Sequence, residues 1–226
     1  MKKSLSFLLV SIIFSLHVLA QREIKIISYN VLEGLGNEES YGEGRHERCV
    51  KWLKEQKADV IALQELYKSE EKLSADAKEW GHKYYAKAGP IGLSSKEPIE
   101  FVKKYKNGLW HGVLHIKTYG IDFLVVHLSP AEWMFRLREA EIIRGIVDSV
   151  KQTTKSYILM GDFNAHSPFD AELYKQNPEL IIKYKNGSPN NSSPNLAGDY
   201  PDFHFSYAQN SDLRINNPAE KLFYFG

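Results

Sequence analysis

Residues 157–164 of the chain read YILMGDFN. The first four are apolar at consecutive positions, which is typical of a strand that is buried on both faces of its sheet. Gly161 ends the apolar run, and Asp162, Phe163 and Asn164 follow it. Side chains two residues apart on an extended backbone point to the same side, so we expect Asp162 and Asn164 to face one cavity while Phe163 packs the other way.

Two earlier apolar runs also end on polar residues. The run at 24–28 leads to Asn30, and the run at 59–63 leads to Glu65. Sites in α/β proteins collect at the carboxyl ends of strands, so these positions are candidates for chemistry. Between the two runs, helical spacing relates His46, Cys49, Val50 and Leu53. The domain is therefore predicted to open with the order strand, helix, strand.

Short strands and two further helices are predicted downstream. A helix is expected over 70–80, and the segments from 84 to 126, separated by Gly, Pro and Asn, indicate antiparallel strands with a hairpin turn at Gly120. These strands centre on Tyr84, Leu93, Ile99, Val113 and Phe123. The pattern as a whole favours a mixed α/β sandwich.

The longest helix is predicted to begin just after Ser129. Ser129 and Glu132 form a capping box, and Pro130 takes the first helical position. One apolar stripe follows, formed by Trp133, Leu137, Ala140, Ile143, Val147 and Val150. Residues 186–198 are dominated by Asn, Ser, Pro and Gly, which predicts a loop.

The first twenty residues resemble a secretory signal peptide. Lys2 and Lys3 precede an uncharged stretch at 5–19, and Ala20 ends a small-residue cleavage signal before Gln21. The alternative, a membrane anchor, needs a longer apolar run of about 18 to 20 residues. We therefore expect a signal peptide over 1–20, a domain over 21–226, and a secreted or periplasmic protein.

Composition excludes several classes of function. With 226 residues, 43% of them hydrophobic, the chain is long enough for one domain with a large core. Its single cysteine, Cys49, forms no internal disulfide and no cysteine-rich zinc site. The net charge is 29 minus 28, or +1, and loss of Lys2 and Lys3 makes it −1, so no general basic field attracts nucleic acid.

The polar residues at the strand ends have an ordinary interpretation when each is taken alone. A glutamate at a strand end is usually solvated, and an asparagine or aspartate there usually forms a turn. Together, however, Asn30, Glu65 and Asp162 form a constellation. Glu65 offers the hard oxygen that Mg²⁺ prefers, and Mg²⁺ takes one or two carboxylates and leaves its other positions to water and phosphate.

Four motifs, in this order and at these separations, resemble the endonuclease/exonuclease/phosphatase superfamily, which has the DNase-I-like fold. They are Ser28-Tyr29-Asn30, Leu63-Gln64-Glu65, Val126-His127-Leu128 and Gly161-Asp162-Phe163-Asn164. Gly92 to Lys96, before Pro98 and Ile99, also resembles a middle strand of that family. The resemblance runs from about 24 to 174. It implies two packed mixed β-sheets flanked by helices.

The resemblance also implies roles for individual residues. Asn30 and Glu65 would hold a divalent metal, Mg²⁺ or Mn²⁺, and Asp162 would orient or deprotonate the attacking water. Asn164 would contact the scissile phosphate, and His127 would donate to a phosphate oxygen. The chain would then be a secreted, monomeric phosphoesterase that cleaves a phosphodiester or phosphomonoester in nucleic acid, a lipid head group or a small molecule, with no membrane span after signal cleavage.

Other residues near these motifs are weaker candidates. His127 on its own could be a histidine packed beside the long helix, and His111 and His166 could either flank the substrate or lie on the surface. Phe135, together with Trp133, could give the substrate an apolar wall, although Trp133 also lies on the core stripe of its helix.

One expected motif of the superfamily is not found. The family closes with a Ser-Asp-His triplet, and here the nearest match, Ser211-Asp212-Leu213, has Leu where His belongs. We therefore expect a chain truncated at its carboxyl end, with the last strands of the fold missing. The alternative to a working enzyme is a catalytically impaired fragment that binds only metal and phosphate.

Overall fold

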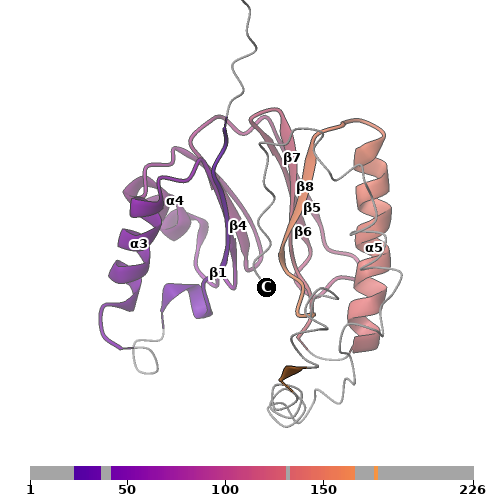
Figure 1. The fold of residues 1–226 in the computed structure, drawn as a ribbon, viewed down its shortest axis with the longest axis horizontal. Helices are drawn as coiled ribbons and strands as arrows, with labels where there is room; N and C mark the ends of the chain where they lie inside the picture. The colour runs from indigo at the N-terminus through magenta and orange to yellow at the C-terminus, as the bar shows by residue number, and fades with distance from the viewer. Residues whose placement is uncertain (1–22, 37–41, 131–132, 166–175, 178–226) are drawn as a thin grey trace, which may run out of the picture.

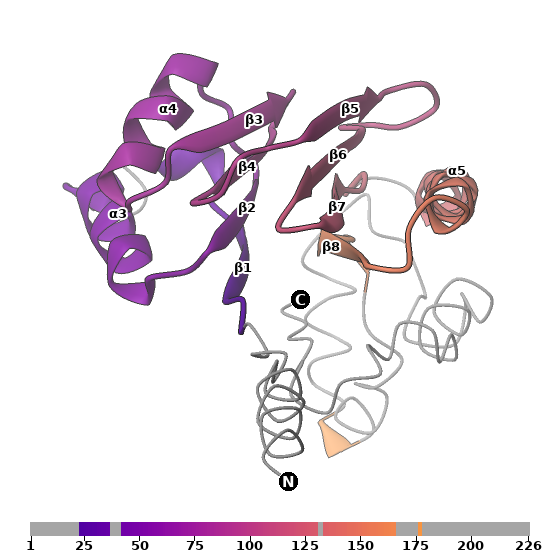
Figure 2. The ribbon, with the colours of Figure 1, turned by 90° about the horizontal axis from the view of Figure 1, so that it is seen from above.

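A computed structural model describes residues 23–36, 42–130, 133–165 and 176–177. Two four-stranded sheets face each other in the middle of the molecule. Helices cover the outer face of each sheet, so the layers run helix, sheet, sheet, helix (Figures 1 and 2). This arrangement confirms the expected α/β sandwich of two mixed sheets flanked by helices.

The first sheet is built from the amino-terminal half of the described chain. Its strands follow the order β1-β2-β4-β3, with β1 parallel to β2 and the other pairs antiparallel. The strands are β1 (Ile26–Asn30), β2 (Val60–Gln64), β3 (Tyr84–Ala88) and β4 (Ile91–Ser95). The outer helices are α3 (Arg45–Gln56) and α4 (Glu70–Glu79), and a short 3-10 turn, η1 (Glu33–Leu35), follows β1. The predicted opening of strand, helix and strand is confirmed.

The second sheet is built from the following segment. Its order is β5-β6-β7-β8, with β7 parallel to β8 and the other pairs antiparallel. The strands are β5 (Phe101–Tyr105), β6 (Val113–Thr118), β7 (Ile121–His127) and β8 (Tyr157–Asp162), and α5 (Trp133–Lys151) covers their outer face. Tyr119 and Gly120, with φ of 57° and 71°, make the predicted hairpin turn between β6 and β7.

The core has three parts because there are three interfaces between layers. Side chains from both sheets fill the central interface, among them Val60, Ala62, Leu93, Ile116, Phe123, Val125, Ile158 and Met160. A second cluster lies between the first sheet and helices α3 and α4, and a third lies between the second sheet and α5. The stripe predicted for the long helix is buried at Ala140, Ile143 and Val150.

The alternation of side chains along the strands decides what lies at their ends. In β7, Phe123 and Val125 belong to the central core, and His127 is the next residue on that side. In β8, Ile158 and Met160 belong to the central core, and Asp162 is next in the same way. The polar residues that end the strands therefore continue the inner face of the sandwich.

Several sequence predictions fall outside the described residues. They concern the signal peptide at 1–20, the capping residue Glu132, the side chain of His166, the loop at 186–198 and the carboxyl end of the domain. Within the described part of the chain, no helix has the length and apolar character needed to cross a membrane.

Candidate active site

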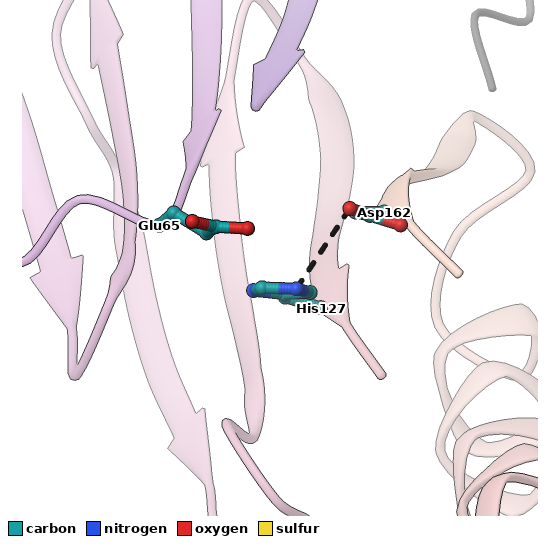
Figure 3. A group of neighbouring side chains, drawn as sticks. All are labelled: Glu65, His127 and Asp162. Atoms are coloured by element: carbon teal, nitrogen blue, oxygen red, sulfur yellow. Dashed lines mark ion pairs between the residues drawn. The ribbon is translucent and has the colours of Figure 1, made fainter. Parts of the chain in front are cut away.

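Asn30, Glu65, His127 and Asp162 come together at the carboxyl ends of four strands. β1 and β2 of the first sheet supply Asn30 and Glu65, and β7 and β8 of the second supply His127 and Asp162. Figure 3 shows the side chains of Glu65 and Asp162 reaching toward each other from opposite sides, beside the His127 ring. The site therefore lies on the seam between the two sheets.

Asn30 joins the two carboxylates. Its Nδ2 atom donates to Glu65 Oε1 at 3.0 Å and to Asp162 Oδ2 at 2.8 Å. Its Oδ1 atom accepts from the backbone N–H of Leu32 at 2.9 Å, which fixes the orientation of the amide. The amide nitrogen of Asn30 thus bonds to a carboxylate from each sheet, while its oxygen faces the η1 turn.

The backbone of Glu65 breaks the alternation of its strand. Ile61 and Leu63 face the outer helices, so strict alternation would point Glu65 the same way. Its φ is instead 57°, a left-handed value that costs a non-glycine residue about 1 kcal/mol or more. The carboxylate reaches the seam, where Oε2 accepts from the backbone N–H of Glu33 at 3.2 Å.

Asp162 and Asn164 form a tight turn at the end of β8. Asp162 Oδ1 accepts from the backbone N–H of Asn164 at 2.8 Å, and Asn164 has a φ of 47°. The Nδ2 atom of Asn164 donates to the carbonyl of Leu128 at 2.7 Å. Phe163 packs on the α5 side, as predicted. Asn164 was expected to face the same cavity as Asp162, but its backbone has left the extended conformation and its amide turns to Leu128.

Glycine is required just before this turn. Gly161 has a φ of 139°, and a Cβ atom there would lie 1.9 Å from the carbonyl oxygen of Val126 on the neighbouring strand. Only a residue without a side chain allows β7 and β8 to approach so closely. Gly161 therefore sets the position from which Asp162 enters the site.

His127 and His111 stack on each other at the floor of the site. Their ring centroids lie 4.4 Å apart with an interplanar angle of 22°. His127 is only 3% exposed, and its Nε2 atom lies 3.8 Å from Asp162 Oδ2, the contact drawn as a dashed line in Figure 3. The structure thus brings His111 to the site, whereas His166 lies outside the described residues.

Both stacked rings are neutral near pH 7. Burial lowers the pKa of His127, and the nearby carboxylates of Asp162 and Glu65 only partly oppose this effect. Burial, followed by the proximity of His127, lowers the pKa of His111 to about 4. Burial therefore favours the neutral form of His127 beside the Asp162 carboxylate.

Exposed aromatic rings line the rim of the site. Tyr67 is 59% exposed and Trp110 is 58% exposed, and their ring centroids lie 6.4 Å and 6.0 Å from that of His111. Phe135 meets the Trp110 ring edge to face at 6.3 Å, next to this rim. The sequence did not single out Tyr67 or Trp110, because a single exposed aromatic residue in a loop carries no pattern.

A buried arginine, Arg45, binds the backbone around the η1 turn, and the sequence did not single it out either. Arg45 donates from Nη1 to the carbonyls of Leu32 and Gly36, at 2.9 and 2.7 Å, and from Nη2 to the carbonyl of Val31 at 2.8 Å. These bonds hold the segment whose N–H groups reach Asn30 and Glu65. The only available signal was a charged residue at the start of an amphipathic helix, a position at which most arginines are solvated.

The donor set of the site fits a divalent metal ion. Glu65, His127 and Asp162 each offer one ligand atom, these atoms lie within 4.8 Å of one another, and no other such group occurs among the described residues. Two converging carboxylates favour a cation, because their negative charges otherwise repel each other. Carboxylate oxygens suit Mg²⁺ and Mn²⁺, and an imidazole nitrogen is a common ligand of transition metals.

Comparison with solved structures shows which proteins share this fold. The chain is similar in structure to a 3′ phosphatase from Neisseria bound to a product DNA hairpin (TM-score 0.52, 18% identity, 71% of this chain and 63% of that one). It is also similar to sphingomyelinase C from Streptomyces griseocarneus (0.50, 17%, 68% and 69%). A third similar structure is an endonuclease/exonuclease/phosphatase family protein from Bacteroides thetaiotaomicron (0.50, 17%, 67% and 68%).

At these identities the structures show a shared fold. No curated protein matches the sequence. The model of the Endonuclease/Exonuclease/phosphatase family matches residues 27–209, which include all the strand ends described above. The chain therefore belongs to the endonuclease/exonuclease/phosphatase family.

Proposed function

We propose that the protein is a divalent-metal-dependent phosphoesterase that hydrolyses a phosphodiester or phosphomonoester bond by in-line attack of water. The observation that carries this proposal is the convergence of Asn30, Glu65, His127 and Asp162 from four strands onto one seam. Membership of the family supports the reaction class, since the similar structures include a 3′ phosphatase and a sphingomyelinase.

Asp162 is the proposed base. One of its oxygens is engaged by Asn164 and the other faces Asn30 and His127, so its carboxylate is held in one orientation. As the water oxygen bonds to phosphorus, its proton passes to Asp162 and the bond from phosphorus to the leaving oxygen breaks. The neutral His127 ring would supply a donor near the negative charge that develops on the phosphoryl oxygens.

Glu65 and Asn30 would hold the metal, Mg²⁺ or Mn²⁺, beside the Asp162 carboxylate. A bound divalent ion supplies Lewis-acid stabilisation of the charge on the phosphoryl group. For its oxygen to become a ligand, Asn30 would have to release the N–H of Leu32 and turn its amide. Asp162 and His127 are the further ligands that the geometry offers.

Nucleic acid, a lipid head group and a small phosphoester are all candidate substrates. The net charge of +1, or −1 after the proposed removal of residues 1–20, argues against reliance on a general basic surface for a long polyanion. We further propose that a signal peptide is removed, so that the protein acts outside the cytoplasm, as a monomer. Amino-terminal sequencing of the exported protein should then begin at Gln21.

The proposal is tested with bis(p-nitrophenyl) phosphate and p-nitrophenyl phosphate under titration with Mg²⁺ and Mn²⁺. Asp162→Asn should lower kcat and kcat/KM together by roughly 10² to 10⁴, the loss expected for a positioned general base. Asp148→Asn, which neutralises an exposed aspartate on α5, is the matched control and should match the wild type.

Two results would overturn the assignment. Turnover by Asp162→Asn at the wild-type rate would remove Asp162 from the chemistry. Metal binding by the wild type without turnover of either substrate would favour the catalytically impaired alternative.

A further inference from the structure

Glu139 is a buried carboxylate outside the catalytic cluster. It lies on α5 and is only 1% exposed. Its Oε1 atom accepts from the backbone N–H of Trp110 at 2.7 Å, and its Oε2 atom accepts from the backbone N–H of Ser129 at 2.8 Å. One side chain thus ties two loops that are 19 residues apart in sequence to the same helix.

Each of these loops adjoins one of the stacked histidines. Trp110 directly precedes His111, and Ser129 follows His127 by two residues. The residue between, Leu128, donates its N–H to the carbonyl of Asp162 at 2.9 Å and accepts from the Asn164 side chain at 2.7 Å. The Ser129 loop is therefore continuous with the turn that holds Asp162.

A second side chain of α5 holds the same loop. Arg136, which is 6% exposed, donates from Nη1 to the carbonyl oxygen of Ser129 at 3.2 Å. Glu139 and Arg136 lie three residues apart on one face of the helix. Glu139 therefore accepts from the N–H of Ser129 while Arg136 donates to its carbonyl. The helix thereby fixes the position and the orientation of this peptide segment.

This arrangement is costly if stability is its only purpose. A carboxylate that is removed from water loses its solvation, and this burial raises the pKa of Glu139 above its usual value. Charge-assisted hydrogen bonds to two N–H groups offset that loss. An apolar side chain at this position would leave both loops without an acceptor.

We propose that Glu139 is a positioning residue for the active site, which holds the His111 and His127 loops so that their rings stack beside Asp162. Glu139 touches no reacting group and acts only through the Trp110 and Ser129 N–H bonds. The catalytic part of this inference rests on the proposed phosphoesterase function. The structural part, the dependence of the ring stack on Glu139, stands independently.

The test compares Glu139→Gln with Glu141→Gln. Glutamine keeps the shape of glutamate but offers one acceptor in place of two, so at least one loop loses its bond. Glu141 lies on the same helix and is exposed, so its variant controls for the lost charge. In Glu139→Gln we expect kcat to fall roughly 10-fold to 100-fold, the usual effect of removing a supporting partner. KM should stay within about twofold, because Glu139 touches no part of the substrate.

Nuclear magnetic resonance supplies a readout that does not depend on turnover. In Glu139→Gln the amide proton signals of Trp110 and Ser129 should move upfield, and the ring protons of His127 should shift as the His111 ring moves away. If Glu139→Gln fails to fold, amide hydrogen exchange in the wild type provides the test. If Glu139 holds both loops, the Trp110 and Ser129 N–H groups should exchange as slowly as those of β7.

The possible results separate the two claims. If the wild type turns over no phosphoester, the proposed function fails, while the amide and ring signals still test the positioning role. A Glu139→Gln variant whose His127 ring signals and kcat match those of the wild type would overturn the inference, even if its melting temperature falls. Rapid exchange of the Trp110 and Ser129 N–H groups in the wild type would overturn it as well.

Discussion

His82 is buried in a small polar network far from the proposed chemistry, and its partners define its protonation. Its Nε2 atom lies 2.9 Å from the carbonyl of Ala58, so this nitrogen carries the proton. Its Nδ1 atom lies 2.8 Å from the hydroxyl of Ser94, which also accepts from Trp80 Nε1 at 3.0 Å. With the ring neutral, Nδ1 accepts from the Ser94 hydroxyl, so Ser94 donates to the ring and accepts from Trp80.

This network predicts a pH dependence of stability. Burial lowers the pKa of His82 in the folded state, so as pH falls below about 6.5 the unfolded chain takes up a proton that the folded chain does not. The free energy of unfolding should therefore decrease at acidic pH, by up to about 1.4 kcal/mol per pH unit for this group. His82→Gln does not titrate but keeps a donor and an acceptor.

Urea unfolding of the wild type and His82→Gln at pH 7.5 and 5.5 measures the difference. The wild type should lose more stability between these values than the variant does. His111 and His127 also have lowered pKa values and remain in both proteins, so their contribution cancels in the comparison. Equal losses in the two proteins would show that His82 is protonated in the folded state.

At the scale of single elements, α4 shows how local sequence fixes a helix end. Ser69 precedes the helix in an extended conformation, and its Oγ atom accepts from the backbone N–H of Lys72 at 3.3 Å. Glu70 and Glu71 then place negative charge on the first turn, where the helix dipole favours it. The helix is therefore capped by its own sequence, independently of the sheet that it covers.

Ser69→Ala should accordingly destabilise the protein by about 1 kcal/mol, the usual effect of losing an N-cap. Ser74→Ala is the matched control, because Ser74 lies inside the same helix, where alanine is the better helix former. Thermal unfolding should show a lower melting temperature for Ser69→Ala and an equal or slightly higher one for Ser74→Ala. The same melting temperature for both variants would mean that the cap contributes nothing.

Helices and strands with a strong hydrophobic periodicity were predictable from the sequence. Site residues were predictable where they continue such a pattern. Strands β1, β2 and β8 and helices α3 and α5 follow from apolar runs and stripes, and alternation along β8 aims Asp162 inward. Alternation alone would have sent Glu65 to the outer face, because a left-handed backbone at a glutamate has no sequence signal. Glu139 was missed because a glutamate in a polar helix sequence resembles any solvated one.

At the scale of the whole molecule, the site couples the two sheets. Glu65 belongs to the first sheet, and His127 and Asp162 belong to the second, so a metal bound between them would contact both. A ligand that binds only the folded state stabilises it, by about 2.7 kcal/mol at a concentration 100 times its Kd. Mg²⁺ or Mn²⁺ should therefore raise the melting temperature of the protein.

Glu65→Gln should abolish that rise, because it removes the first sheet's carboxylate from the seam. Glu55→Gln, at an exposed position on α3, should respond to the metal as the wild type does. Differential scanning calorimetry with and without each metal makes the measurement. An equal shift in Glu65→Gln and the wild type would exclude Glu65 from the metal site.

Each sheet is contiguous in sequence, since the strands of the first span 26–95 and those of the second span 101–162. Contacts within each sheet are consequently more local than those that join Asn30 to Asp162 across 132 residues. The entropic cost of closing a loop grows with its length, so contacts of long sequence separation tend to form late in folding. We therefore predict that Asn30 and Asp162 meet only when the two sheets dock, so the gain of metal binding at the proposed site would report on that docking.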